Sequence, residues 1–413
     1  MTSAPKGARQ LVAPWYCHGV LPTSDAGPDE AAKVRFVGRR AFAVFRAHGY
    51  RELIPTALEP AGHNARIGAP TMALPDGSEL RADGMAALAR AHSLSGKRGQ
   101  FARRMMSGLL FDAAPAGRLR LGSYEVTCGV IFGSAGPAAD AEVGALALAL
   151  GADPGLSEAE LVVSTVGDPG DQQRYLTAIA ELRGLQCDRC QASPDPLRFF
   201  SCDEEGCRAL AAAAPALREF VSTPALKHHE AVLATMEAAG IVARDDVRLA
   251  FGGGRYARTI VELRARATDG ATLAVARGGR RDGLLAALGS AASPAVGLTL
   301  GLVRAAACVT PADASFEPGC EIFIAAQGTA ARAWAFRAAA AERARGFRVD
   351  VDLGDGGWAE QLSRADEVHA RVVVLCGEGE RKNGEVQVRN MRTRETRRIG
   401  EGELTSELKR LLR

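Results

Sequence analysis

The chain has 413 residues, 47% of them hydrophobic, and a formal net charge of +3. This length favours two domains over a single core, and the charge alone does not indicate a nucleic-acid partner. No apolar run reaches membrane-spanning length and the first ten residues lack a signal-peptide core, so a cytoplasmic protein with no membrane partner is expected. The nine cysteines are then expected to be thiols or metal ligands rather than disulfides.

The first three quarters of the chain predict one large domain, residues 1–310. Apolar residues at helical spacing predict a helix over Pro28–His48, and a short strand is expected over Glu52–Leu58. The elements expected next are a strand turning into a helix (Ser78–Ala91), strands of an antiparallel sheet (Gly108–Gly133), a helix (Pro137–Leu150), a strand (Glu160–Val166), a helical insertion with cysteines (178–233) and a return to the sheet (Asp246–Val303).

A linker and a second domain complete the chain. Two prolines and a glycine near residues 311–318 predict the linker, and residues 319–413 alternate strand and helix signals, which is typical of a compact α/β domain. The expected elements are strands (Glu321–Ala326, Phe347–Leu353, Val372–Gly377), helices (Thr329–Arg345, Trp358–Ala370, Glu403–Leu412) and a hairpin (Glu385–Met391 with Arg394–Ile399).

Four cysteines gather in the predicted insertion. Cys187 and Cys190 form a C-x-x-C pair, and Cys202 and Cys207 follow with four residues between them. Four thiolates at such spacing fit a tetrahedral structural zinc site. The alternative is four reduced thiols in a small helical insertion, because the second spacing is looser than the usual two residues.

Several motifs resemble those of the histidyl-tRNA synthetases, a class II aminoacyl-tRNA synthetase family. GGRRDGL from Gly278 resembles the family's GGRYDGL, and PAVGLTLGLVR up to Arg304 resembles its PAVGFAxGLER. GSAGPAADAEV from Gly133 resembles GSDSPEADAEV, and the segment from Gly377 to Glu395 resembles part of the anticodon-binding domain. The resemblance implies an α/β fold: a class II synthetase-like antiparallel sheet with flanking helices, then an anticodon-binding-like α/β domain. It also implies a homodimer.

The resemblance also locates the chemistry, and several positions depart from it. In the family an RPEGT motif holds the ammonium group of histidine, and here Asp83 keeps a shorter carboxylate while Met85 cannot accept a useful hydrogen bond. The other departures are Leu110 for a phosphate-binding arginine, Val130 near the imidazole-binding carboxylate, Phe251 for the catalytic arginine, Arg255 and Arg281 for tyrosines, and Val303 for the glutamate before Arg304. Losing one such transition-state contact costs about 10²–10³ in rate.

Other positions still match the family. Candidates for a residual nucleotide or histidine pocket are Arg81, Asp83, Arg118, Arg120, Tyr256, Arg258, Gly278, Gly279 and Arg304. ATP would bind only if that pocket still functions. The alternative is that the glycines and Arg304 only maintain the fold.

The predicted C-terminal hairpin region is basic. Its candidate RNA-binding residues are Arg381, Lys382, Arg389, Arg392, Arg394, Arg397 and Arg398. On a solvent-facing hairpin such charges would follow a phosphate backbone, although a solvated charged face is the alternative. No aromatic residues interleave to stack bases, so base specificity does not follow.

Three functions remain open. The leading hypothesis is a catalytically degenerate paralogue that regulates, or binds tRNA, other RNA or a protein partner. The second is an active histidine–tRNA ligase whose arginines come from other positions. The third, also implied by the resemblance, is a regulatory subunit that partners the catalytic subunit of ATP phosphoribosyltransferase in histidine biosynthesis. Those subunits generally lack the C-terminal domain that is expected here.

Overall fold

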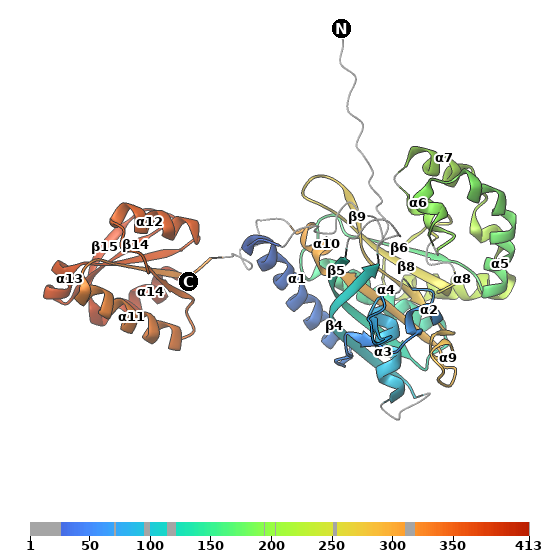
Figure 1. The fold of residues 1–413 in the computed structure, drawn as a ribbon, viewed down its shortest axis with the longest axis horizontal. Helices are drawn as coiled ribbons and strands as arrows, with labels where there is room; N and C mark the ends of the chain where they lie inside the picture. Colours follow the sequence, from blue (N-terminus) through green and yellow to red (C-terminus); the bar gives the residue numbers. More distant parts are fainter. Residues whose placement is uncertain are drawn as a thin grey trace, which may run out of the picture. The chain divides into compact units, whose positions relative to one another are not determined.

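In the computed structural model, the described residues are 26–69, 72–94, 100–113, 121–193, 195–202, 204–250, 254–309 and 319–412. They fall into two compact units, Met1–Asp313 and Ala314–Arg413 (Figure 1). The division between the units falls within the predicted linker 311–318, whose residues lie outside the described ranges. None of the helices in these ranges is long and apolar enough to cross a membrane.

The first unit is built on an eight-stranded sheet in the order β1-β4-β5-β10-β9-β8-β6-β7. Neighbouring strands are antiparallel except at the two edges, where β1 and β7 run parallel to their neighbours. The strands are β1 (Arg51–Glu52), β4 (Ala102–Ala113), β5 (Leu121–Phe132), β6 (Glu160–Thr165), β7 (Arg244–Asp245), β8 (Ala257–Arg266), β9 (Thr272–Arg280) and β10 (Ala295–Gly301). The predicted antiparallel sheet is confirmed.

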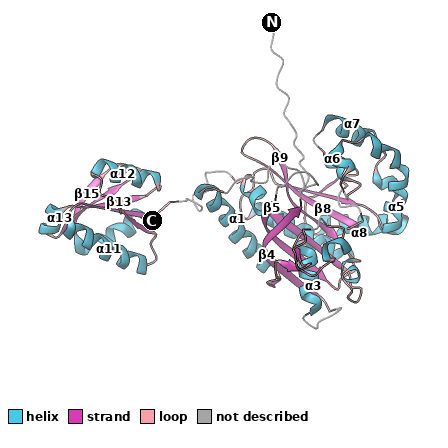
Figure 2. Ribbon diagram, in the orientation of Figure 1, coloured by secondary structure: helices cyan, strands magenta, loops and turns pink. Residues whose placement is uncertain are grey.

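Helices cover both faces of this sheet (Figure 2). α3 (Gly84–Leu94) and α9 (Leu284–Ala287) share a core with Met106, Cys128 and Val130 on one face. α1 (Pro28–Ala47) lies over the other face, where the ring of its Phe45 packs directly against Gly129 of β5. α1 also contacts α4 (Pro137–Ala152) and α10 (Leu302–Ala306).

One predicted strand is wrong. Over Glu52–Leu58 the chain pairs with the main sheet only through β1, and it forms β2 (Leu58–Glu59) against β3 (Glu79–Leu80) in a separate small sheet. Between these strands Pro55 has no N–H to give a neighbouring strand, and Ile54 is 89% exposed. A short helix, α2 (His63–Arg66), follows β2.

The helical insertion differs in extent from the predicted 178–233. It begins earlier, with α5 at Pro169, and its last expected helix, α8 (Thr223–Ala238), packs against α4 on the main sheet instead. The elements of the insertion before α8 are α5 (Pro169–Ala178), η1 (Ala180–Leu185), α6 (Asp188–Gln191), η2 (Arg198–Ser201), α7 (Glu205–Ala213) and η3 (Leu217–Phe220). The cysteine-bearing subdomain therefore spans residues 169–220, which begins and ends earlier than the predicted 178–233.

The second unit has a five-stranded sheet in the order β12-β11-β13-β14-β15. Its strands are β11 (Ile322–Ala326), β12 (Val349–Val351), β13 (Val372–Cys376), β14 (Glu385–Asn390) and β15 (Thr396–Gly400). α11 (Thr329–Ala344) and α14 (Leu404–Leu412) pack on one face, and α12 (Trp358–Glu367) packs on the other. The predicted α/β domain is confirmed, with one unpredicted helix, α13 (Glu378–Asn383), between β13 and β14.

Candidate functional site: a pocket region with internally paired charges

Asp83, the shortened carboxylate of the expected ammonium site, has internal partners for both of its oxygens. Arg281 Nη1 lies 2.7 Å from Asp83 Oδ2, and the Ala86 N–H donates to Oδ1 at 2.9 Å, at the start of α3. Burial alone would raise the pKa of Asp83, but Arg281, the Ala86 N–H and Arg255 hold it below its ordinary value. The carboxylate is therefore charged at neutral pH and already neutralised by the protein.

Arg281 also lies over an aromatic ring. Its guanidinium carbon is 5.7 Å from the ring centroid of Tyr256, a cation–π distance. The Arg281 side chain is only 3% exposed; its Nη1 donates to Asp83, while its Nε is buried without a hydrogen-bond partner among the described residues. Asp83, Tyr256 and Arg281, which we call the Asp–Tyr–Arg cluster, thus form one contact network from the residues just before α3, just before β8 and just after β9.

Arg258 stands beside this cluster in an unusual backbone conformation. Its φ is +55° and it lies at an irregularity where the pairing of β8 with β9 shifts between Ala257 and Ile260. Its Nε donates to Asp168 Oδ1 at 3.0 Å, just before α5. A left-handed arginine is strained and such residues gather at functional sites, but here the side chain joins the sheet to the insertion.

Arg81 and Met85 contribute to the fold. Arg81 is 5% exposed, and its guanidinium donates to the backbone carbonyls of Pro55, Thr56 and Leu109 at 2.7–3.2 Å. Met85, 2% exposed, packs in the core between α3 and the sheet. Neither side chain is placed to bind a ligand.

The positions expected to face the triphosphate and the imidazole are apolar and buried. Leu110 on β4 is 3% exposed, and Val130 on β5 is fully buried. Val303 lies half-buried in α10, next to the buried Arg304. Arg118, Arg120 and Phe251 lie outside the described residues.

The retained glycines are required by strand packing. A Cβ at Gly278 would lie 2.0 Å from the carbonyl oxygen of Gly297, and one at Gly279 would lie 2.3 Å from that of Thr259. Gly279 also has φ +148°, where a side chain is strained. The close approach of β9 to β8 and β10 explains both glycines, which supports the alternative that they maintain the fold.

Two further ionic networks hold the sheet together. Arg280, which is fully buried, pairs with Asp140 at the start of α4 and donates to the carbonyls of Ser134 and Gly136. Glu262, also fully buried, accepts from Arg277 at 2.5 Å and from Arg264 at 2.6 Å. Burial raises the pKa of Glu262, but the two arginines outweigh it and keep the pKa low, so the group stays charged.

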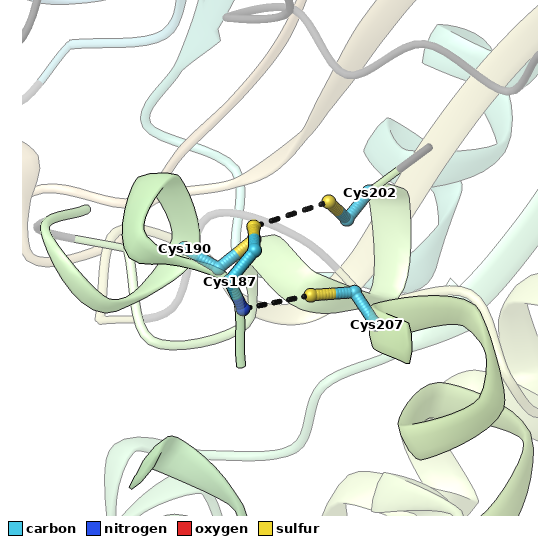
Figure 3. Close-up of side chains that lie close together, drawn as sticks. All are labelled: Cys187, Cys190, Cys202 and Cys207. Atoms are coloured by element: carbon cyan, nitrogen blue, oxygen red, sulfur yellow. Dashed lines mark hydrogen bonds between the residues drawn. The ribbon is translucent and has the colours of Figure 1, made fainter. Parts of the chain in front are cut away.

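The four cysteines of the insertion converge (Figure 3). Their Sγ atoms all lie within 4.8 Å of one another, and Cys190, Cys202 and Cys207 are buried. None of the four forms a disulfide. Among the residues that the structure describes, this is the one cluster of His, Cys, Asp or Glu side chains that could hold a metal ion by ligand distance.

Several basic residues of the second unit pair with carboxylates of the same unit. Arg381 pairs with Glu401 in front of the Trp334 ring, Arg394 lies 3.3 Å from Asp366, and Arg397 lies 3.3 Å from Glu407. Arg389 is half-buried, and Arg398 lies 3.8 Å from Glu385 and 3.9 Å from Glu380. Lys382 and Arg392 are exposed, and within the described part of the chain no carboxylate lies at ion-pair distance from either.

Sequence reasoning noticed the substitutions that build the Asp–Tyr–Arg cluster but not their contact. Asp83 and Arg281 are 198 residues apart, and nothing in the two motifs taken separately indicates that they meet. The signal was a complementary change: a carboxylate kept in one motif and a new arginine in another. Asp168 carried no such signal, because only the fold brings it to Arg258.

Comparisons with known proteins agree on one family. Residues 23–167 match the family described as "Histidyl-tRNA synthetase", and residues 321–411 match "Anticodon binding domain". The histidine–tRNA ligase of Moorella thermoacetica is 31% identical over 394 residues, which cover 89% of this chain and 92% of that protein. That of Trichlorobacter lovleyi is 29% identical over 394 residues, 90% and 93% of the two chains.

Solved structures share the fold at lower identity. The apo histidyl-tRNA synthetase of S. aureus superposes with a TM-score of 0.69 at 23% identity, covering 97% of this chain and 99% of that one. A Bacillus halodurans C structure described as an ATP phosphoribosyltransferase regulatory subunit/histidyl-tRNA synthetase gives 0.64 at 17% identity, covering 88% and 99%.

Proposed function

This chain belongs to the histidyl-tRNA synthetase family, and we propose that it is a catalytically degenerate member that retains RNA binding through its C-terminal unit. The observation that carries the proposal is the pairing of Asp83 with Arg281 at 2.7 Å. In active relatives, as the motif implies, the corresponding carboxylate receives the ammonium group of histidine. Here a guanidinium of the protein itself already holds that carboxylate.

An incoming histidine would have to displace this guanidinium. Arg281 is 3% exposed, and an arginine buried without its partner typically costs several kcal/mol. A new ammonium–carboxylate contact returns only about 1.5–3 kcal/mol. The balance therefore favours the internal pair over the substrate.

The ATP side of the pocket supports the same proposal. At the position of Leu110 the family motif has an arginine that binds the triphosphate. Leu110 is uncharged and 3% exposed. Each missing contact to transition-state charge costs about 10²–10³ in rate. With Phe251 at the catalytic arginine position as well, we expect adenylation to fall by at least about 10⁴ relative to an active relative.

Histidine-dependent ATP–pyrophosphate exchange tests this proposal. We expect the full-length protein to show no exchange above the no-histidine background, beside an active bacterial relative as the positive control. Exchange within about tenfold of the control would overturn the proposal and establish the alternative of an active histidine–tRNA ligase.

RNA binding is proposed for the C-terminal unit, with Lys382 and Arg392 as candidate phosphate contacts. These two cations are exposed, lie at ion-pair distance from no carboxylate in the described residues, and belong to a unit that matches the anticodon-binding family. Free surface cations can replace the counterions of a phosphate backbone. The expected ligand is a tRNA, and the expected assembly is a homodimer, which sedimentation would detect.

A salt-titrated shift assay with tRNA-His tests the RNA part. Substitution of Lys382 and Arg392 by Glu should lower affinity and reduce the salt slope by about two, one for each lost phosphate contact. Arg337→Glu, an exposed arginine on α11 in the same unit, is the matched control and should bind like the wild type. Equal loss in both variants, or no binding by the wild type, would remove RNA binding from the proposal.

A regulatory partnership is the second candidate. The structural neighbour from Bacillus halodurans C is described as an ATP phosphoribosyltransferase regulatory subunit/histidyl-tRNA synthetase, and the shared fold covers 88% of this chain. Co-elution with the catalytic subunit of that transferase would favour this candidate over tRNA binding. The anticodon-binding-like unit at residues 321–411 weighs against it.

A further inference from the structure

The four cysteines of the insertion are the strongest unexplained feature of the molecule. We propose that Cys187, Cys190, Cys202 and Cys207 bind one structural Zn²⁺ that holds the insertion together (Figure 3). The site is independent of the pocket chemistry, so its test is separate from that of the proposed function.

The spacing of the sulfur atoms fits a tetrahedral zinc ion. With Zn–S bonds of about 2.3 Å, the edge of a regular tetrahedron is about 3.8 Å. The Sγ atoms of Cys187 and Cys202 lie 3.8 Å apart, and all four atoms lie within 4.8 Å of one another. Small rotations of the side chains would close the remaining distance.

The backbone around the first pair has the compact shape that a C-x-x-C ligand pair needs. Cys187 is the N-cap of α6, and its carbonyl accepts the N–H groups of Cys190 at 2.9 Å and Gln191 at 3.0 Å. This turn brings the two thiols to one side. Cys202, after η2, and Cys207, in α7, supply the other side from separate elements.

Groups beside the cysteines suit anionic sulfur. The backbone N–H of Cys187 points to the Sγ of Cys207 at 3.3 Å, and Arg189 Nη2 lies 3.6 Å from the Sγ of Cys202. On binding, each thiol releases its proton to solvent as its sulfur bonds to zinc, and no electron is transferred. Four thiolates and Zn²⁺ carry a net charge of −2, which the Arg189 cation and the N–H donor offset.

The small size of the insertion gives the metal a structural role. Its longest helix, α5, has 10 residues, and its apolar core is limited to a cluster that includes Tyr175, Leu197 and Phe199. Folds with so little core commonly need a metal or disulfides. A closed set of four thiolates, with no position left for water, is the arrangement of structural rather than catalytic zinc.

The alternative is that the thiols are ordinary small apolar side chains. The cysteines outside the insertion that the structure describes (Cys128, Cys308, Cys320 and Cys376) behave in that way, because none belongs to a cluster with metal-ligand spacing. Four thiols from four positions converging on one point require a further cause. A shared metal ion supplies it.

The insertion borders the Asp–Tyr–Arg cluster, so the metal would also steady that region. Gln172 on α5 donates to the carbonyl of Tyr256 at 2.8 Å and accepts from the N–H of Gly254 at 3.0 Å. Loss of zinc should therefore loosen the insertion first and the start of β8 next. The C-terminal unit should not respond.

Metal analysis of the full-length protein, purified without a chelator or a histidine tag, is the direct test. We expect about one zinc per chain, released on titration of the thiols with a mercurial. After exchange into Co²⁺, the visible spectrum should show the d–d bands of a tetrahedral site and a thiolate charge-transfer band. A metal-free protein, iron in place of zinc, or two disulfides among the four cysteines would each overturn the proposal.

Variants locate the site. Cys202→Ser and Cys207→Ser should each lose the zinc, whereas Cys320→Ser, which changes a half-buried cysteine outside the cluster, should keep it. Hydrogen exchange on the wild type with and without chelator covers the case in which a variant misfolds. Exchange should rise over 187–207 and stay constant over 322–408, and unchanged exchange over 187–207 would contradict a structural role.

Discussion

The residues around the main sheet of the first unit and the basic residues of the second unit use their charges differently. Around the main sheet, Asp83, Asp140 and Glu262 are each paired with a buried arginine. In the second unit Lys382 and Arg392 remain exposed to solvent. A charge that the fold has already neutralised must give up its partner before it binds a substrate, whereas an exposed charge without a partner need not.

The largest loss of stability is expected at Gly279, because its backbone conformation and close neighbours leave no room for a side chain. Gly279→Ala would place a Cβ 2.3 Å from the carbonyl oxygen of Thr259 at φ +148°, so the first unit should lose at least about 4 kcal/mol of unfolding free energy. Gly283→Ala is the matched control, because nothing lies within 4 Å of its Cβ position. Denaturant unfolding monitored on the first unit measures both. Equal stability of the two variants would return Gly279 to a role in ligand binding.

The buried ion pair of Arg280 and Asp140 should follow. Both side chains are fully buried, so Asp140→Ala removes the buried partner of the Arg280 guanidinium, leaves it only Asp282 at 3.2 Å as an ion-pair partner, and should cost about 3–4 kcal/mol. Asp153→Ala breaks the pair of Asp153 with Arg40, in which both side chains are more than a third exposed, and should cost at most about 1 kcal/mol. Thermal unfolding of the first unit compares them. Similar losses would mean that the buried pair is not what holds α4 to the sheet.

The Asp–Tyr–Arg cluster gives a pH-dependent prediction. The pKa of Asp83 is lowered in the fold, so its charged form contributes stability above its ordinary pKa near 3.8, and this stability is lost as the pH falls through the lower folded value. Asp83→Asn should therefore cost about 2 kcal/mol at pH 7. The difference from the wild type should shrink below about pH 4.

Arg281→Gln tests the cause of that dependence. Without the guanidinium, the loss of stability between pH 7 and about pH 2.5 should be smaller than in the wild type, because the main group that lowers the Asp83 pKa is gone. Urea midpoints at the two pH values provide the measurement. An unchanged pH dependence in Arg281→Gln would show that Asp83 is not committed to Arg281, and the pocket argument would fail with it.

Much of the fold could be predicted because strong local patterns decide it. The stripe of Val34, Val37, Ala41 and Val44 defines α1, and it packs as expected. Prediction failed where pairing with distant strands determines the secondary structure. Over Glu52–Leu58 the expected strand is interrupted at Pro55. α13 was missed because a short polar run gives no periodic apolar signal; the left-handed Gly384 ends that helix.

The site was predictable only in its parts. The cysteines were found from spacing, since C-x-x-C pairs carry their geometry in the sequence. Arg81 was a pocket candidate, but its donors are taken by three backbone carbonyls that only the fold brings together. The pairing of Asp83 with Arg281 joins α3 to the end of β9, and no local pattern encodes a contact between elements so distant in sequence.

The smallest effects are expected among the basic residues of the second unit. Arg397 lies 3.3 Å from Glu407, so part of its charge is already neutralised and Arg397→Gln should weaken tRNA binding by less than about threefold. Lys382→Gln and Arg392→Gln should each weaken it more, by about three- to tenfold at low salt, because the ion-pair partners found elsewhere in this unit are missing at these two positions. Binding titrations at two salt concentrations resolve the order. If Arg397→Gln had the larger effect, the exposed, uncompensated cations would not be the RNA contacts, and the contrast between the two units would no longer rest on which charges the fold has used.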